Sequence, residues 1–240
     1  MRILGFDTAT RATAVALLDT EAGVAIERRD DPPPSVRPRH TTRLMGLIAE
    51  VLSAGGAGWE AIDLIAVGIG PGTFTGLRIG VATARALSQA RGIGLVGVST
   101  LESLAGAASE ATGEEEAIVA VLDARRGEVF AAGWSAQTAT HPDREPTMNA
   151  RAGAPEAIAD TAQRLGLRWL AVGDGAVEFR PVLERSGARI PEDDSSLHRV
   201  TAVTHCRLAS SRRPGSPDGV QPEYLRLPDA ELNLRASQKL

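Results

Sequence analysis

Residues 62–104 read IDLIAVGIGPGTFTGLRIGVATARALSQARGIGLVGVSTLESL, and this stretch decides the fold of the chain. It opens with an apolar run of strand length at 64–67 and continues into a turn rich in glycine and proline, which interrupts regular backbone. The pattern then predicts a helix from about 76 to 90 and a second buried strand at 95–98. A strand, a helix and a strand in this order favour a parallel or mixed sheet with a right-handed crossover, and hence an α/β fold.

The turn before this helix has two open interpretations. Gly70, Gly72 and Thr73 lie near the helix start, where free N–H groups and the helix dipole attract anions. However, the turn lacks the Gly-Lys-Ser/Thr of a Walker loop and the glycine spacing of a dinucleotide-binding fingerprint. Residue chemistry alone therefore favours a structural turn over a phosphate site.

Small residues follow one face of the same helix. Gly76, Gly80, Ala84 and Ser88 recur every four residues, so another backbone can approach this face closely. Glycine inside a helix costs roughly 1 kcal/mol relative to alanine, which indicates a close contact that offsets the cost. The contact is either with the protein's own sheet or with a partner helix.

Composition excludes several classes of protein. The chain has 240 residues and a net charge of −4, so no overall basic field draws it to nucleic acid. The single cysteine, Cys206, excludes an internal disulfide, and the four histidines lack the spacing of a helical metal pair. The polar start MRILGFDTAT is no secretory signal, and no apolar run approaches the ~20 residues of a membrane span. We therefore expect a cytoplasmic protein without a metal site.

Two similar hairpins are predicted far apart in the chain. A short strand at 3–6 leads into Asp7 and Thr8 and returns at 13–18; residues 117–134 repeat this plan around Asp123. The repeat predicts two lobes of related topology. On spacing alone, Asp7 is better explained as a turn residue that bonds its own backbone than as a phosphate or metal residue.

Other segments complete the predicted elements. Residues 40–54 form an amphipathic helix, residues 137–154 are irregular, residues 200–212 form the last substantial helix, and residues 221–227 form a final strand that returns to the sheet. No serine lies in a nucleophile elbow, so no hydrolase motif is present in the sequence.

Five motifs together resemble one known family, the bacterial TsaB (formerly YeaZ) family. They fall in the same order and at similar spacing over residues 1–227: MRILGFDTAT, VGIGPGTFTGLRIGVATARAL, GVSTLESLA, LDARRGEVFAA and QPEYLR. The resemblance implies the fold of actin, Hsp70 and sugar kinases (ASKHA), with two lobes that each contain an RNase-H-like mixed sheet. The first lobe would comprise residues 1–100 with 201–227 packed back on it, the second would comprise 101–200, and 228–240 would be a disordered tail.

The resemblance also implies a function. Members are non-catalytic accessory subunits required for threonylcarbamoyladenosine modification of tRNA next to the anticodon. They bind and support the catalytic paralogue TsaD, with the ATPase TsaE, and meet tRNA through the complex. By this resemblance the chain has no catalytic residue and no cofactor of its own, while the complex uses ATP and a divalent metal.

Individual residues carry this expectation further. A vestigial phosphate site would comprise Asp7, Thr8, Gly70, Gly72 and Thr73. The metal-binding HxxxH of TsaD is incomplete, because His40 stands at its first position and Leu44 at its second. In kinases of this fold the second hairpin turn has glycines that admit phosphate, whereas Arg125 and Arg126 occupy it here.

The implied partner surface lies on two helices of the first lobe. We expect TsaD to dock on the residues Leu44, Leu47, Ile48, Val51, Gly76, Gly80 and Ala84. Without TsaD, the same exposed face would form a homodimer. Two alternatives are kept: an independent ATP-dependent enzyme of the kinase fold, and a peptidase that acts on its paralogue.

Overall fold

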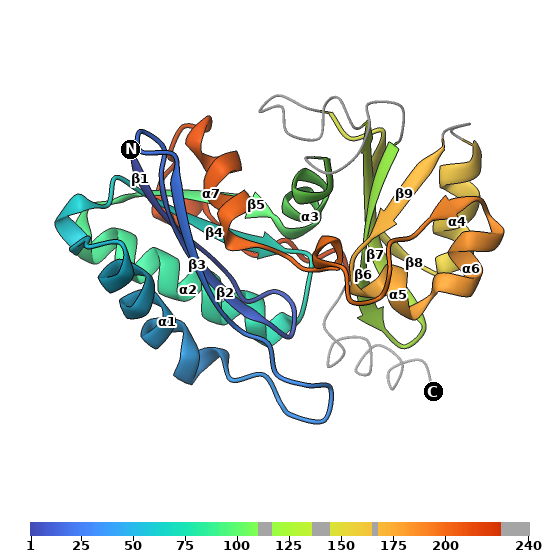
Figure 1. Ribbon diagram of the computed structural model, residues 1–240, viewed down its shortest axis with the longest axis horizontal. Helices are drawn as coiled ribbons and strands as arrows, with labels where there is room; N and C mark the ends of the chain where they lie inside the picture. Colours follow the sequence, from blue (N-terminus) through green and yellow to red (C-terminus); the bar gives the residue numbers. More distant parts are fainter. Residues whose placement is uncertain (110–116, 136–144, 165–167, 227–240) are drawn as a thin grey trace, which may run out of the picture.

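The computed structural model describes residues 1–109, 117–135, 145–164 and 168–226, which form two lobes side by side (Figure 1). Each lobe is built on one five-stranded sheet, with the strand orders β3-β2-β1-β4-β5 and β10-β9-β6-β7-β8. In each lobe three strands form an antiparallel meander, and the first of them pairs in parallel with a fourth strand. The predicted repeat of the two hairpins is therefore confirmed.

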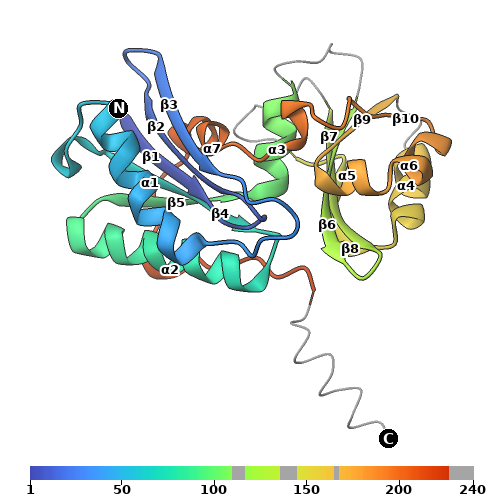
Figure 2. The same cartoon turned by 60° about the horizontal axis from the view of Figure 1, so that its bottom comes forward.

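The first lobe has helices on both faces of its sheet. Its strands are β1 (Arg2–Asp7), β2 (Thr13–Asp19), β3 (Val24–Asp30), β4 (Leu64–Gly70) and β5 (Gly94–Ser99). Figure 2 shows α1 (His40–Ala54) and α2 (Phe74–Arg91) on one face and α7 (Ala202–Ser210) on the other. Alternate residues of each strand face the two helix layers: Leu4 and Phe6 point to α1 and α2, whereas Ile3 points to α7.

The second lobe repeats this layering. Its strands are β6 (Ala117–Arg125), β7 (Glu128–Ser135), β8 (Met148–Gly153), β9 (Trp169–Val172) and β10 (Ala188–Arg189). Helix α3 (Thr100–Ser109) covers one face; α4 (Pro155–Arg164), α5 (Asp174–Glu178) and α6 (Arg180–Arg185) cover the other. Short 3-10 turns complete the elements: η1 (Trp59–Ala61), η2 (Ser196–His198) and η3 (Pro217–Gly219).

Two predicted segments differ from the structure. Residues 148–153, predicted as irregular, form the edge strand β8, whose polar side chains lie on its exposed face. Residues 221–226 form no strand, because Pro222 lacks the N–H that a ladder requires; the segment instead contacts the first sheet through Glu223 N–H and Ile69 O (2.7 Å). Leu227 and the predicted disordered tail at 228–240 lie outside the described residues.

The residues expected to form the partner surface are buried within this chain. Leu44, Leu47, Ile48 and Val51 are at most 2% exposed and pack on the first sheet, and Ala84 is 0% exposed in the same core. Gly76 and Gly80 are also buried. The prediction that these residues form an exposed docking face is therefore wrong, because the apolar stripe of an amphipathic helix faces the core of its own chain.

The lobe boundaries given above stay a prediction, although α7 does pack against β1 and β2 of the first lobe. Within the described residues, none of the helices combines the length and the apolar character needed to cross a bilayer.

Candidate functional site

The glycines of the 68–80 stretch make room for the turn between β1 and β2. The four glycines concerned are Gly68, Gly72, Gly76 and Gly80. A Cβ atom at any of these four would lie 1.8–2.4 Å from an atom of Asp7, Thr8 or Ala9, which is closer than real Cβ atoms come. The small-residue face of α2 therefore serves a close contact within this chain.

The predicted phosphate-site residues come together, but their polar groups bind one another. Thr73 N–H donates to Ala9 O (2.7 Å), and Thr8 Oγ1 donates to Gly76 O (2.7 Å). Gly70 has a φ of +111°, and a Cβ atom there would lie 2.9 Å from Glu223 O. The geometry thus favours the structural turn, and phosphate binding by Asp7, Thr8, Gly70, Gly72 and Thr73 stays a prediction.

Asp7 is buried and paired with a histidine from the far end of the chain. The residue is 1% exposed; Oδ1 accepts from Ala9 N–H (2.7 Å) and Oδ2 accepts from Thr100 Oγ1 (3.0 Å). Nε2 of His205 lies 3.1 Å from Oδ2, at an angle that fits an ion pair better than a hydrogen bond. Burial raises the pKa of Asp7, but His205, the Ala9 N–H and the Thr100 hydroxyl together hold this pKa below its ordinary value.

The other side of the His205 ring also faces hydrogen-bond acceptors. Nδ1 lies 3.0 Å from Thr201 O and 2.9 Å from Ser103 Oγ. Because a carbonyl oxygen faces one ring nitrogen and a carboxylate the other, the doubly protonated imidazolium fits this site best. Burial lowers the pKa of His205, yet the contact with Asp7 raises it overall. No local sequence pattern indicates this pair, because its two members are 198 residues apart (205 − 7).

Ser103, His205 and Asp7 have the composition of a hydrolase triad, but they lie inside the molecule. Ser103 and His205 are 0% exposed and Asp7 is 1% exposed. Ser103 Oγ also lies 3.2 Å from Thr201 O, to which it can donate. A nucleophile must reach its substrate, so this set of residues cannot attack a peptide in the conformation described.

His40 is likewise engaged within the chain. Its Nδ1 lies 2.8 Å from Thr13 Oγ1, the residue is 5% exposed, and burial lowers its pKa. In the ranges that the structure describes, no cluster of three or more His, Cys, Asp or Glu side chains could hold a metal ion.

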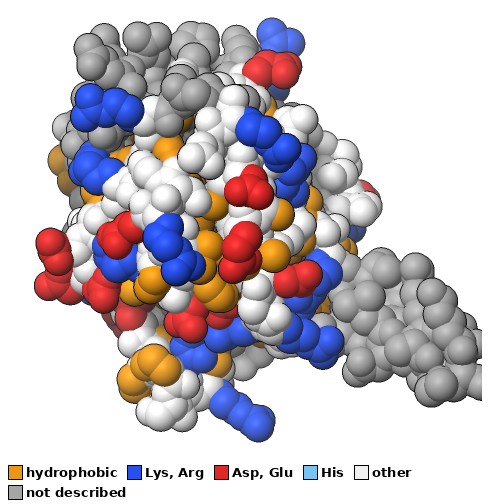
Figure 3. Space-filling model, turned by 90° about the vertical axis from the view of Figure 1, so that its right-hand side faces the viewer, with side chains coloured by type: hydrophobic (Ala, Val, Ile, Leu, Met, Phe, Trp, Pro, Cys, Tyr) orange, Lys and Arg blue, Asp and Glu red, His pale blue; other side chains and the backbone are white. Residues whose placement is uncertain are grey.

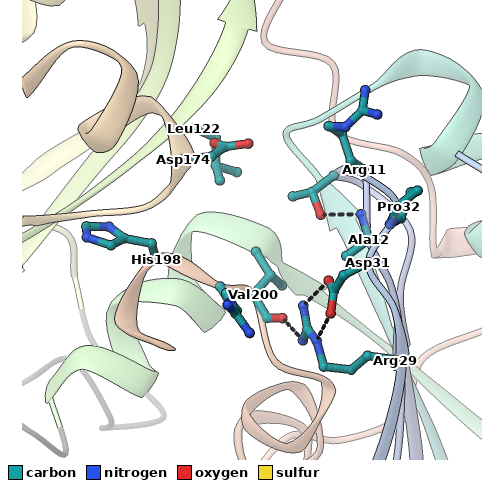
Figure 4. A pocket seen from close by; sticks show the side chains of 11 residues that line it. Arg11, Ala12, Arg29, Asp31, Pro32, Leu122, Asp174, His198 and Val200 are labelled. Carbon is teal, nitrogen blue, oxygen red and sulfur yellow. Dashed lines mark hydrogen bonds and ion pairs between the residues drawn. The ribbon is translucent and has the colours of Figure 1, made fainter. Parts of the chain in front are cut away.

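The two lobes enclose a small polar cleft (Figure 4). The first lobe contributes Arg11, Arg29 and Asp31, and the second contributes Leu122 and Asp174. The guanidinium of Arg29 donates twice to Asp31 (3.0 and 2.9 Å) and once to Val200 O (2.6 Å). The cavity measures about 140 Å³, whereas pockets for drug-sized ligands measure about 300–1,000 Å³. It is too small for a nucleotide.

The turn of the second hairpin carries arginines in an unusual backbone conformation. Arg125 and Arg126 have φ values of 67° and 59°, in the left-handed region. Asp123 holds Arg125 twice: Oδ1 accepts the backbone N–H (2.7 Å), and Oδ2 lies 2.9 Å from Nη1.

The outer face of the second lobe has a mixed surface. In Figure 3, basic, acidic and apolar side chains alternate over the coloured part of this face. This mixture agrees with the net charge of −4, and this view shows no broad basic patch on the described residues.

Comparisons with known proteins place these features in a family. The family described as "TsaD: tRNA N6-adenosine threonylcarbamoyltransferase" matches residues 32–169. The Escherichia coli protein "tRNA threonylcarbamoyladenosine biosynthesis protein TsaB" is 30% identical over 230 residues, covering 94% of this chain and 95% of that protein.

Solved structures agree with the sequence comparisons. YeaZ from Pseudomonas aeruginosa superposes with a TM-score of 0.73 at 28% identity, covering 93% of this chain and 99% of that one. The ethanolamine utilization protein EutJ from Carboxydothermus hydrogenoformans superposes with a TM-score of 0.53 at 13% identity, which shows the fold alone. The two-lobed fold of actin, Hsp70 and sugar kinases is thereby confirmed. The chain belongs to the TsaB (YeaZ) family.

Proposed function

We propose that this chain is an accessory, non-catalytic subunit required for the threonylcarbamoyladenosine modification of tRNA. The observation that carries the proposal is its likeness to the E. coli TsaB protein over nearly the whole of both chains. The proposed role implies a cytoplasmic location.

The state of Asp7 supports a non-catalytic role. In a phosphotransferase of this fold the equivalent carboxylate must be open to a metal-bound water, whereas here His205 and Thr100 occupy it. The incomplete HxxxH pattern at His40 and Leu44 supports the same conclusion. ATP and a divalent metal would then be used by other members of the complex.

The catalytic paralogue TsaD is the proposed principal partner, with the ATPase TsaE and, through the complex, tRNA. The match of residues 32–169 to the TsaD family indicates that the two chains share this part of the fold. Related chains can pair through equivalent helices, so we keep α1 and α2 as the docking elements and move the contact to their outer face.

The exposed residues of the two helices include one methionine and several small residues. Met45 is 49% exposed, and Gly46, Ala49, Ala82 and Ala86 are exposed as well. Small side chains allow a partner helix to approach closely, and Met adapts to the surface it meets. In the absence of TsaD this outer face would support a homodimer.

A reconstitution tests the function. TsaD, TsaE, the synthase of the threonylcarbamoyl donor, tRNA, threonine, bicarbonate and ATP are combined with and without this chain. We expect modified adenosine only when the chain is present. Equal product without it would overturn the proposal.

A substitution on the outer face tests the docking surface. Ala82→Arg should reduce TsaD binding at least tenfold, because a long charged side chain would be buried in a helix contact. The melting temperature of the free chain should stay within about 2 °C, because the residue is exposed. Ala22→Arg, at an exposed turn of the first lobe, is the matched control. Unchanged binding by Ala82→Arg would move the interface elsewhere.

A peptidase is the second candidate, because Ser103, His205 and Asp7 lie together. Their burial predicts that a fluorophosphonate probe does not label the native chain, and that purified TsaD stays intact in its presence. Labelling that disappears in Ser103→Ala would instead support a hydrolase.

A further inference from the structure

The hairpin of β6 and β7 closes in a turn whose backbone conformation arginine rarely adopts. Arg125 pairs with Glu128, which leaves Arg126 and Gly127 as the two turn residues. Both have positive φ values, 59° and 76°. A two-residue hairpin loop with positive φ at both positions is a type I′ turn, whose first position favours Asn, Asp or Gly.

Arginine is therefore an unusual residue type for this backbone conformation. Long side chains rarely adopt left-handed φ, whereas Asn and Gly do so readily. Two consecutive arginines adopt it here, Arg125 at a register shift of the ladder and Arg126 in the turn itself. Asp123 holds the backbone and the side chain of Arg125 within the chain, and residues in strained backbone conformations cluster at functional sites.

The side chains at this tip carry a net positive charge, because three guanidinium groups lie beside two carboxylates, Asp123 and Glu128. Arg125, Arg126 and Gly127 are all exposed. A third guanidinium reaches the same end of the hairpin, because Arg226 Nη1 lies 2.9 Å from Glu128 Oε2. Each guanidinium carries five N–H donors, so an arginine that bonds one carboxylate can still bond a second anion.

We infer that this arginine tip, defined as Arg125, Arg126 and Arg226, binds the phosphodiester backbone of tRNA. The inference rests on the proposed function and names a nucleic-acid contact for it. The planar fork of arginine matches phosphate oxygens, and contacts to the backbone need no particular base. The hairpin that carries Arg125 and Arg126 belongs to the second lobe, whereas α1 and α2 lie on the first (Figures 1 and 2).

Three variants of the full chain test the inference, each measured alone and in the complex with TsaD and TsaE. Arg126→Asn supplies the preferred turn residue and removes the charge, whereas Arg126→Lys keeps both the charge and the strain. Arg28→Gln removes one exposed arginine from β3, where the backbone is unstrained, and is the matched control for charge.

Arg126→Asn should raise the melting temperature by about 2–4 °C because it relieves backbone strain. The same variant should weaken binding of unmodified tRNA about fivefold near 0.1 M salt. It should also reduce the slope of log affinity against log salt by about one. Arg126→Lys should retain most of the affinity, and Arg28→Gln should bind like the wild type.

Other outcomes overturn the inference. A lower melting temperature in Arg126→Asn would mean that the arginine serves contacts within this chain. Equal tRNA affinity of Arg126→Asn and the wild type would exclude a phosphate contact. Loss of TsaD binding with unchanged tRNA affinity would assign the tip to a protein interface. A wild-type complex that binds no tRNA and forms no modified adenosine would instead refute the proposed function.

Discussion

Both carboxylate oxygens of Asp7 contact polar groups of the same chain. A backbone N–H, a threonine hydroxyl and an imidazolium surround its two oxygens. His205 joins three segments in this way, since it also contacts Ser103 of α3 and Thr201 before α7. Asp7 is therefore part of the buried interior of the chain.

This pair predicts a specific dependence of stability on pH. Asp7→Asn should lower the free energy of unfolding by about 3 kcal/mol, because it leaves a buried imidazolium without its counter-charge. The folded-state pKa of His205 is raised, so its contribution is complete below about pH 6.5 and is lost as pH rises through that pKa. The folded-state pKa of Asp7 is lowered, so its contribution is complete above about pH 4 and is lost as pH falls.

The free energy of unfolding of the wild type should therefore exceed that of Asp7→Asn most between about pH 4 and pH 6.5, as measured by urea denaturation across pH. His205→Gln should remove the extra stability in the same pH range. The double variant should lose less free energy of unfolding than the two single variants lose together. A constant difference from pH 4 to pH 9 would mean that the pair is not ionised.

At the scale of the elements, the glycine stripe of α2 packs against the β1–β2 turn. A Cβ atom at Gly76 would lie 2.0 Å from Thr8 O, a backbone atom that cannot rotate away. The glycine of α1, Gly46, has nothing within 4 Å of the same position. Both are helix glycines, so they form a matched pair that differs in surroundings.

Gly76→Ala should therefore destabilise the free chain by about 3 kcal/mol, because the helix must move away from the turn. Gly46→Ala should stabilise it by about 0.5–1 kcal/mol through helix propensity. Thermal denaturation of both variants compares these effects. A stable Gly76→Ala variant would show that α2 can shift without loss of packing.

The sequence patterns predicted the positions of helices and strands better than they predicted which face of a helix meets the core and which meets a partner. The strand, turn and helix of 62–104 and the two hairpins follow from local apolar periodicity and glycine positions, and the structure confirms them. The stripe Leu44, Leu47, Ile48 and Val51 identified α1 correctly, but the same stripe marks the side that faces the core. The small residues of α2 left an inner and an outer contact equally open. The Asp7–His205 pair depends on the tertiary fold, so no local pattern could indicate it.

At the scale of the molecule, the C-terminal segment connects the lobes. Gly215 N–H donates to Leu95 O (3.3 Å) at the edge of the first sheet. Nε of Arg78, which lies on α2, donates to the hydroxyl of Tyr224 (3.1 Å) in the C-terminal segment. Leu225 then packs on the core of the second lobe. The segment therefore contacts both lobes.

The narrow cleft leads to the prediction that the free chain does not bind MgATP. The lining of the cavity of about 140 Å³ includes Arg11 and Arg29, which already bond groups of the chain, and His205 pairs with Asp7. A ligand present at a hundred times its Kd stabilises a protein by about 2.7 kcal/mol, which would raise the melting temperature by several degrees. Millimolar MgATP should therefore shift the melting temperature of the free chain by less than 1 °C, within the error expected for no binding.

Turnover of ATP provides the complementary measurement. We expect no phosphate release by the purified chain, because nucleotide cannot reach an open carboxylate between the lobes. The Asp7→Asn variant is the matched control, since contaminating ATPases would give the same rate with both proteins. An ATP turnover that is stoichiometric with the chain and absent from Asp7→Asn would mean that the lobes open and His205 releases Asp7. The protein would then be an ATP-dependent enzyme of the kinase fold rather than an accessory subunit.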